Sequence, residues 1–525
     1  MDFNRIKLIF HTVKYLRFGQ IAYRVLYALR KRFVNKEYTQ ELKGTILPLQ
    51  WSNIIEKSTS CLKKFEFRFL NITHAFEETV DWNYNQYGKL WTYNLNYFDF
   101  LNQSSIEQSE ALLLMRDYVD RTDELKDGLE PYPISLRCIN WIKYLSKENI
   151  QDHLINKSLY NQYLRLLDSL EYHLLGNHLL ENGLSLLFGA YYFKDDVLYL
   201  KAKNIIEEQM EEQILEDGAH FELSPMYHQI ILDRVLDCIC LVKDNPWKEN
   251  YALLTLMNLK ATEMLSWLNE VTFKDDIIPM VNDSAFGIAP DTSSLLDYGE
   301  NLKIFPRKVQ LSASGYRKFT NDTYEFFTDV GEVGPTYQPG HAHADTFNFV
   351  LNTDKPIIVD PGLSTYNMGE IREKERSTIY HNTVTINAVN SSKVWAGFRV
   401  ADRANVTIEK DEKNELIASH NGYKGKGIKH TRSFKVDLSE IHIKDSINKD
   451  SEAQAHFHFH PDCQLKVNSS KNEIQVDNIT ITFDVCNELQ RSLYQYAHGY
   501  NNRLEADKIS VTFRNSLETK IKIEG

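Results

Sequence analysis

The stretch GHAHADTFNFVLNTDKPIIVDPGLSTYNMGEIREKERSTIYHNTVTIN (340–387) carries most of the information about the fold. Within it, FNFVLNT, KPIIVD and HNTVTIN are short runs rich in β-branched and aromatic residues, and turn residues such as the Pro-Gly pair at 361–362 separate them. Runs of this composition and length are typical of strands joined by tight turns. The stretch therefore predicts three neighbouring strands.

Polar side chains with metal-binding chemistry lie at the ends of these predicted strands. His341 and His343 are two residues apart and would share one strand face, Asp360 ends the second strand, and His381 opens the third. Three neighbouring strands would bring His343, Asp360 and His381 together. Two imidazoles and one carboxylate suit Zn²⁺, with water or another group in the fourth position. The alternative is that they are separate polar residues at strand ends.

The strand pattern continues to the end of the chain. Segments such as IHIKDSI (441–447), ITITFDV (479–485) and ISVTFRN (509–515) alternate polar and apolar residues with a period of two. At least ten such runs in about 215 residues predict an antiparallel β-sandwich domain over 306–525. The boundary falls near 300–312.

The residues before this boundary have a different periodicity. In 104–121, 135–148, 155–175, 198–215, 229–244 and 251–271, apolar residues recur at i, i+3, i+4 and i+7. Polar or glycine-containing connections separate these segments. The pattern predicts a helical domain over 1–305, built as an array of helix hairpins with no strands between them.

Composition narrows the function classes. The formal net charge of the 525 residues is −12, which argues against a nucleic-acid-binding protein. The six cysteines lack CxxC spacing, so we predict neither a thiolate zinc site nor a disulfide framework. We expect no transmembrane helix and no signal peptide, and hence a location in the cytoplasm or at the inner face of the membrane. No feature of the sequence indicates a particular oligomeric state.

The N-terminus is strongly basic. Residues 3–36 contain nine Lys or Arg and no Asp or Glu, and the apolar residues of 5–32 recur at roughly helical spacing. One interpretation is a basic helix packed on its own domain. The other is a helix that makes peripheral contact with an anionic membrane.

Two segments of the helical half carry candidate chemistry at helix starts. GNHLLENG (176–183) places Asn177 and His178 at a helix N-terminus, where backbone N–H groups favour a carboxylate. SPMYH (224–228) places Tyr227 at another helix start. The alternatives are capping by Asn177 and simple packing of Tyr227.

Further candidates for substrate binding lie nearby in the sequence. PYPISLRCINW (131–141) offers Tyr132, Arg137 and Asn140, and the last two share one helix face. Glu222 lies in the loop before Tyr227 and adds a carboxylate.

These segments together resemble one known family. GHAHADTFNFVL, VDPG and YHNTV, in this order, resemble the C-terminal half of the heparinase II/III family, and GNHLLENG and SPMYH resemble its helical half. The resemblance extends from about residue 65 to the C-terminus. It implies an incomplete (α/α) toroid followed by an antiparallel β-sandwich. It also implies cleavage of uronic-acid polysaccharides by β-elimination, and one structural Zn²⁺ per chain on His343, Asp360 and His381.

The resemblance also assigns roles in catalysis. Tyr227 matches a tyrosine that acts in proton transfer, and Asn177 and His178 match the groups that bind the substrate carboxylate. His341 matches a histidine that reaches the cleft from the sandwich, and Tyr366 matches loosely a second tyrosine. Secreted lyases of the family carry a signal peptide, whereas this chain looks more like members encoded with surface-polysaccharide assembly genes.

Elimination requires a neutralised carboxylate and a base at C5 of the uronic acid. Tyr227 as phenolate or neutral His341 are the candidate bases, and a phenolate would need a nearby cation, for which His178 and Arg137 are candidates. The sequence leaves two other classes open. One is a glycoside hydrolase that uses Glu181 and Glu222, and the other is a non-catalytic glycan-binding or assembly protein.

Overall fold

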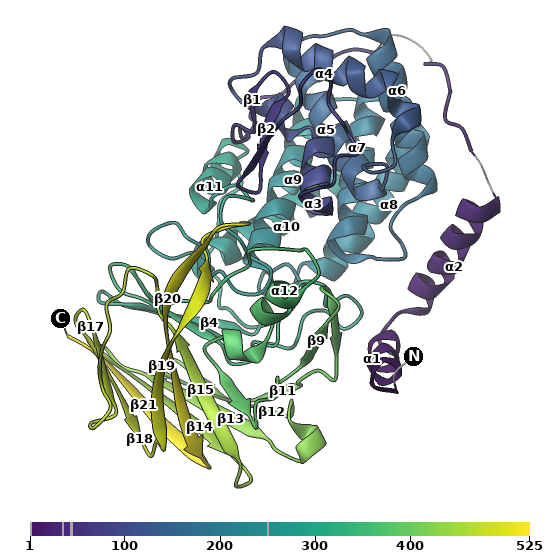
Figure 1. Ribbon diagram of the computed structural model, residues 1–525. Coiled ribbons are helices and arrows are strands. Elements are labelled where there is room, and N and C mark those ends of the chain that lie inside the picture. Colours follow the sequence, from purple (N-terminus) through teal and green to yellow (C-terminus); the bar gives the residue numbers. More distant parts are fainter. Residues whose placement is uncertain (1–2, 34–35, 43–45, 249–250, 525) are drawn as a thin grey trace.

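Helices dominate the first part of the chain in the computed structural model, which describes residues 3–33, 36–42, 46–248 and 251–524 (Figure 1). Most of the helices predicted from apolar periodicity are present, although the one expected over 155–175 already ends at residue 168. The main helices are α3 (Lys89–Tyr97), α4 (Gln108–Asp120), α5 (Pro131–Lys147), α6 (His153–Asp168), α7 (Gly176–Phe193), α8 (Asp196–Gln213), α9 (Pro225–Asp244), α10 (Tyr251–Val271) and α11 (Thr292–Asn301).

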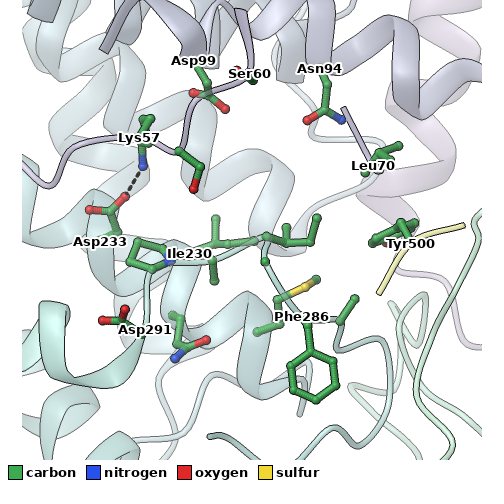
Figure 2. A pocket seen from close by; sticks show the side chains of 18 of the residues that line it. Lys57, Ser60, Leu70, Asn94, Asp99, Ile230, Asp233, Phe286, Asp291 and Tyr500 are labelled. Atoms are coloured by element: carbon green, nitrogen blue, oxygen red, sulfur yellow. Dashed lines mark hydrogen bonds and ion pairs between the residues drawn. The ribbon is translucent and has the colours of Figure 1, made fainter. Parts of the chain in front are cut away.

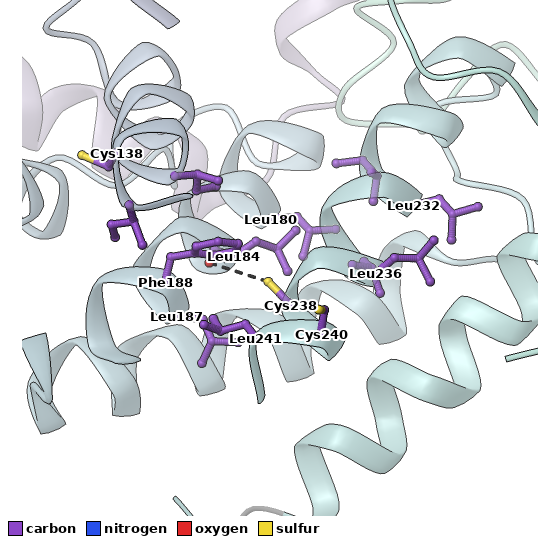
Figure 3. Packing of buried hydrophobic residues seen from close by; sticks show 14 of the residues in the cluster. Cys138, Leu180, Leu184, Leu187, Phe188, Leu232, Leu236, Cys238, Cys240 and Leu241 are labelled. Atoms are coloured by element: carbon purple, nitrogen blue, oxygen red, sulfur yellow. Dashed lines mark hydrogen bonds between the residues drawn. The ribbon is translucent and has the colours of Figure 1, made fainter. Parts of the chain in front are cut away.

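The centre of this domain is apolar on all sides. Helix α7 is buried over nearly its whole length, because LSLLFGAYYF leaves no polar face to turn outward. Figure 3 shows Leu184 of α7 beside Cys238 of α9, whose thiol lies 3.9 Å from the Leu184 carbonyl oxygen, and Leu187 and Leu236 belong to the same buried cluster. The cysteines behave as expected from the sequence: all six are free, and five of them are buried. This packed centre holds the first turns of α7 and α9 in fixed positions.

The N-terminal part differs from the sequence-based expectation in two ways. Residues 5–32 do not form one helix but two, α1 (Phe3–Val13) and α2 (Phe18–Phe33). The first helix does not continue into the second, because the Gln20 side chain accepts the Arg17 backbone N–H and so caps the start of a new helix. In addition, the helical half is not free of strands: β1 (Cys61–Lys63), β2 (Glu66–Phe69) and β3 (Ile72–Ala75) form a small antiparallel sheet. Its turns place Phe65 and Asn71 at positive φ, a feature that apolar periodicity does not reveal.

Antiparallel sheets build the second domain, as expected. One sheet has eight strands in the order β11 (Val406–Glu412), β12 (Glu415–His420), β13 (His430–Val436), β14 (Glu440–Ile447), β21 (Ser516–Ile523), β18 (Ile479–Asp484), β17 (Glu473–Val476) and β16 (Lys466–Asn468). A four-stranded sheet has the order β19 (Glu488–Ala497), β20 (Arg503–Arg514), β15 (Glu452–His458) and β8 (Val384–Ile386). Another has the order β4 (Tyr316–Thr320), β5 (Glu325–Asp329), β6 (Phe349–Asn352) and β7 (Pro356–Ile358).

The alternation of buried and more exposed side chains along the strands explains how these sheets form one core. In β14 and β21 every second side chain is buried, and these residues pack with Phe326, Phe349 and Phe457 from the smaller sheets. One face of the large sheet thus points into the sandwich and the other is more exposed, as is usual for antiparallel sheets. A short helix, α12 (Glu370–Glu375), and a hairpin of β9 (Lys393–Trp395) and β10 (Arg399–Ala401) lie outside this core.

The two domains are joined by direct contacts. The hairpin β19–β20 reaches the helical domain (Figure 1), where the Asn71 side chain donates to the Tyr500 carbonyl (3.0 Å) and the Asn501 side chain donates to the Leu70 carbonyl (2.9 Å). The Tyr316 hydroxyl donates to the Leu223 carbonyl (2.5 Å), just before α9. Among the described residues, no helix is long and apolar enough to cross a membrane.

Candidate active site

A cavity of about 940 Å³ lies where the two domains meet. The helical domain lines it with Tyr97, Tyr132 and Tyr227, and the sandwich contributes Tyr366 and Tyr500. Figure 2 shows Tyr500 on one side of the cavity and Asp233 with Asp291 on the opposite side. Phenol rings offer flat apolar faces with polar tips, which suits the stacking and hydrogen bonding of sugar rings.

The N-terminus of α7 lies next to this cavity and is occupied by a carboxylate of the protein itself. Glu222 accepts the Asn177 backbone N–H (2.9 Å) and the Asn177 side-chain N–H (3.0 Å). The backbone at Gly176 has φ +60°, and a Cβ there would lie 2.4 Å from a Glu222 oxygen, so only glycine permits this approach. The sequence predicted an open anion site at this helix start; the structure fills it with Glu222, itself a predicted substrate-binding residue.

Asn177, His341, Tyr227 and Tyr366 form a continuous set of contacts across the domain boundary. The Asn177 side-chain nitrogen lies 3.4 Å from His341 Nε2. The His341 ring stacks on the Tyr227 ring, with centroids 3.9 Å apart. The Tyr227 hydroxyl lies 3.2 Å from the Tyr366 hydroxyl, which is itself 3.4 Å from His341 Nδ1. Tyr227 and Tyr366 line the cavity, whereas Asn177 is buried and His341 is nearly buried just behind the Tyr227 ring.

Helix capping explains why Tyr227 is held so firmly. Pro225 opens α9 and Ser224 is its N-cap, accepting the Tyr227 backbone N–H (3.3 Å). Proline suits this first position because its missing N–H would have no partner there. The Ser224 hydroxyl also donates to the Asp283 carbonyl (2.7 Å), which ties the start of α9 to the loop beneath His341.

Asp283 is the buried anchor of the cluster. It is fully buried and accepts both Arg372 nitrogens, at 2.5 and 2.7 Å. Its two oxygens also contact His341 Nδ1 (2.9 Å) and His343 Nε2 (2.8 Å). Burial alone would raise the pKa of Asp283, but the Arg372 guanidinium and the two histidines outweigh it and hold the pKa well below its ordinary value. An ionised Asp283 that accepts from His341 Nδ1 favours the tautomer in which Nε2 carries no hydrogen; Nε2 lies 3.4 Å from the Asn177 side-chain nitrogen and 3.4 Å from Glu222 Oε2.

His178 lies beside the cluster in a second ion pair. Its Nδ1 contacts Glu171 (3.0 Å), and its ring packs against Tyr132, with centroids 4.8 Å apart. Burial alone would lower the pKa of His178, but the Glu171 carboxylate outweighs it and the pKa is raised. His178 thus adds an imidazolium to the first turn of α7, where Glu171 already pairs with it.

Protonation of the other groups follows from their burial. Burial raises the pKa of the Tyr227 hydroxyl above its ordinary value near 10, so the phenol stays protonated at neutral pH. Burial likewise raises the pKa of Glu222. Tyr227 is therefore suited to donate a proton rather than to act as a phenolate, contrary to one of the two sequence-based options.

Of the four predicted substrate-binding residues, Arg137, Asn140 and Glu222 do not line the cavity. Arg137 is fully buried in the toroid, where it donates to the Gln162 side chain (2.6 Å) and to two backbone carbonyls, and it lies outside the cavity lining. It cannot be the cation that activates Tyr227. Asn140 is buried too, and it donates to Asp99 (2.6 Å), which does line the cavity. Helical spacing correctly placed both on one face, but that face points into the core. Of the four, only Tyr132 lines the cavity.

The predicted metal ligands His343, Asp360 and His381 are buried and adjacent. The two imidazole centroids are 5.2 Å apart, and Asp360 contacts His381 Nδ1 (2.8 Å). His343 Nδ1, His381 Nε2 and Asp345 Oδ2 are buried without a hydrogen-bond partner. Such atoms call for an explanation, and two imidazole nitrogens with a carboxylate are the donor set that Zn²⁺ prefers. Within the described ranges, however, no three His, Cys, Asp or Glu side chains are already grouped as a metal site.

Sequence reasoning missed four residues of the site. Asp283 and Arg372 lie in segments without a recognisable pattern, and only the fold joins them to His341. Glu171 precedes α7 in an irregular turn. Asp345 was the easiest of the four to predict from the sequence, since it follows His341 and His343 at the same two-residue spacing.

The chain is similar to known proteins over nearly its whole length. The family profile described as Heparinase II/III N-terminus matches residues 24–312, and the profile described as Heparinase II/III-like, C-terminal, matches residues 306–524. A heparin-sulfate lyase of Bacteroides stercoris is 24% identical over 323 residues, which cover 54% of this chain. The match spans 45% of that curated relative, less than half of its length.

Solved structures resemble the fold over a greater length. A crystal structure of heparinase III superposes with a TM-score of 0.70 at 15% identity, covering 100% of this chain and 93% of that one. The heparan sulfate lyase HepC of Pedobacter heparinus superposes with a TM-score of 0.57 at 16% identity, covering 88% of this chain and 82% of that one. At this identity the likeness is one of architecture, an (α/α) toroid followed by an antiparallel β-sandwich.

Proposed function

Because the chain belongs to the heparinase II/III family, we propose that it is a polysaccharide lyase that cleaves a uronic-acid-containing glycan by β-elimination. The observation that carries the proposal is the contact series at the domain boundary. Asn177 reaches His341 (3.4 Å), and His341 stacks on Tyr227 (3.9 Å between centroids). A polar amide, an imidazole and a protonated phenol on one sugar are the groups that elimination requires.

The first requirement is to neutralise the substrate carboxylate, because the C5 proton is hardly acidic beside a carboxylate anion. The Asn177 side-chain N–H donates to Glu222 in this structure and would have to switch to the substrate carboxylate, and Glu222, whose pKa is raised by burial, supplies an O–H when it is protonated. The raised pKa of His178 keeps a positive charge nearby. Hydrogen bonds that strengthen as charge develops on the carboxylate are the largest electrostatic contribution available here.

The proton transfers then follow from the two ring contacts. His341 Nε2 takes the C5 proton while Asp283 holds Nδ1, the arrangement by which a carboxylate orients a general base. The electron pair of the C5–H bond forms the C4–C5 double bond, and the C4–O bond breaks. Tyr227 gives its phenolic proton to the leaving oxygen, and the raised pKa of Tyr227 favours this donor role.

The test is incubation of the purified chain with a panel of uronic-acid polysaccharides. Elimination leaves an unsaturated uronate that absorbs in the ultraviolet. The summed mass of the two products equals the mass of the uncleaved polysaccharide. Hydrolysis adds one water to that total and creates no absorbance. Products that carry the added water would contradict the lyase proposal.

We also propose that His343 and His381, with Asp345 or Asp360, hold one structural Zn²⁺. The support is the set of buried unpaired donor atoms described above. The two histidines do not lie on neighbouring strands as the sequence predicted: His343 is in the loop between β5 and β6, and His381 is in the loop before β8, which belongs to another sheet. A bound zinc would fix these two loops. Asp283 contacts both His343 and His341, so the same fixation would orient the His341 ring.

A further proposal is that α1 and α2 contact an anionic membrane. Their inner face packs on the protein: Tyr23 stacks on Tyr172, and Trp395 donates to Thr12 (3.2 Å). Their outer face exposes large apolar side chains among basic ones, with Phe18 85% and Phe33 71% exposed. The packed inner face agrees with the first sequence interpretation, and the exposed outer face supports the proposed membrane contact.

Flotation with vesicles tests the membrane contact. Binding to phosphatidylglycerol vesicles at low salt that weakens at high salt is the expected result. The Lys31→Glu/Arg32→Glu variant should lose this binding. Absence of binding of the wild-type chain at low salt would leave α1 and α2 as packing elements alone.

A further inference from the structure

The charge of the cavity differs from what a sulfated substrate requires. Its ionisable lining comprises five carboxylates and three cations, namely Glu56, Asp99, Asp233, Asp276 and Asp291 against Lys57, Arg68 and Arg234. Sulfate groups are normally bound by Arg and Lys through charge-assisted hydrogen bonds. The cavity therefore has an excess of the charge that repels them.

Two of the three cations are already committed to carboxylates. Lys57 pairs with Asp233 (2.9 Å), as Figure 2 shows. Arg234 is buried and pairs with Glu181 (3.2 Å) and Asp237 (3.1 Å). For Arg68, which is exposed, the described contacts include no ion pair of its side chain. A sulfated sugar would have to compete with carboxylates for nearly every positive charge.

The carboxylates at the far end are built into the fold. Asp291 is the N-cap of α11 and accepts the Ser294 backbone N–H (2.8 Å), and Asp276 accepts the Ser293 backbone N–H (3.1 Å). These bonds use the N–H groups that would otherwise make the start of α11 an anion site. The end of the cavity opposite Tyr500 thus presents negative charge where a helix N-terminus would favour an anion.

We propose that the sugars bound beyond the cleaved uronate carry no sulfate, so that the substrate is an unsulfated glycan. Its far subsite, at Asp276 and Asp291, takes hydroxyl, N-acetyl or amine groups that donate to these carboxylates. The Tyr97 and Tyr132 rings line the same cavity as Tyr227 and contact each other edge to face. This inference rests on the proposed function for the position of the uronate.

The test compares two oligosaccharides of equal length and backbone, unsulfated heparosan and its N- and 6-O-sulfated derivative. Affinity is measured by calorimetry on the full-length Tyr227→Phe chain, and turnover by ultraviolet absorbance on the wild-type chain. We expect the sulfated compound to bind at least ~10-fold more weakly. The Asp276→Asn/Asp291→Asn variant keeps both capping acceptors but removes two charges. It should reduce the ratio of the two affinities, unsulfated to sulfated, at least ~3-fold.

A matched control separates this local effect from overall charge. The Asp484→Asn/Glu488→Gln variant also removes two negative charges, from exposed residues of β18 and β19. It should leave the ratio within ~2-fold of the wild-type value. An equal reduction of the affinity ratio in both variants would refute the role of Asp276 and Asp291.

The outcomes also separate this inference from the lyase proposal. If the sulfated compound binds as tightly as the unsulfated one, or if neither binds, the inference is wrong, whether or not other uronate polymers are cleaved. If the unsulfated compound binds better but no unsaturated product forms from any polymer, the inference stands and the lyase proposal fails.

Discussion

Replacing Tyr227 by Phe tests the proton donor with little change in packing. The ring, stacked on His341 with centroids 3.9 Å apart, is retained, and the contact between hydroxyl groups that is lost is the one to Tyr366 (3.2 Å). Loss of one such hydrogen bond costs about 0.5–1.5 kcal/mol of unfolding free energy. Loss of a general acid should lower turnover by at least ~10²-fold, or about 2.7 kcal/mol in the barrier. The effect on catalysis should therefore exceed the effect on stability.

The assay is initial-rate absorbance of the unsaturated product, together with urea unfolding of the same preparations. Tyr118→Phe is the matched control, because the Tyr118 hydroxyl is buried in the toroid core without a hydrogen-bond partner. This control should keep wild-type turnover. If Tyr227→Phe retains more than about a third of wild-type kcat/KM, the proton is delivered by another group and the reasoning is wrong.

Further predictions concern the residues around Tyr227. Asn177→Ala should reduce kcat/KM by about 10²-fold or more in the same absorbance assay, because it removes a donor to the substrate carboxylate; a loss below threefold would contradict that role. Glu222→Gln keeps a neutral hydrogen-bonding group and should retain at least about a tenth of the activity, whereas a hydrolase that used Glu222 as an acid or nucleophile would lose it entirely. Elemental analysis of protein purified without added metal should find about one zinc per chain and much less in His343→Ala; equal amounts in both would exclude His343 as a ligand. Since the pKa of His178 is raised, the stabilisation from its pair with Glu171 should be complete below about pH 6.5 and lost as the pH rises through the raised value. Urea unfolding at several pH values should show this loss in the wild type and not in His178→Gln.

The two-domain architecture could be predicted from periodicity because one period dominates each domain. The predicted helix 251–271 coincides with α10, and the alternation in IHIKDSI coincides with β14. The small sheet at 61–75 was missed because it depends on turns at positive φ, which no hydrophobic period reports. The single N-terminal helix was wrong because a side-chain hydrogen bond at Gln20 interrupts an otherwise continuous pattern.

The candidate site was predictable where residues are close in sequence and not where the fold alone joins them. Asn177, His178 and Tyr227 occur in short segments at helix starts, so local rules indicated them. Asp283 contacts a histidine about 60 residues away, and no local pattern encodes such a pairing. Arg137 failed for the opposite reason: spacing gives the face of a helix but not which face the core covers.

The division of the site between two domains has a consequence for its assembly. Tyr227 and Asn177 belong to the toroid, whereas His341 and Tyr366 belong to the sandwich. The chain between α11 and β4 is short, so it holds the two halves at an effective concentration on the order of millimolar or more. Two halves produced as separate polypeptides, divided near residue 306, would have to associate as a bimolecular reaction. Their activity should then rise with the square of dilute protein concentration, whereas that of the intact chain rises in direct proportion.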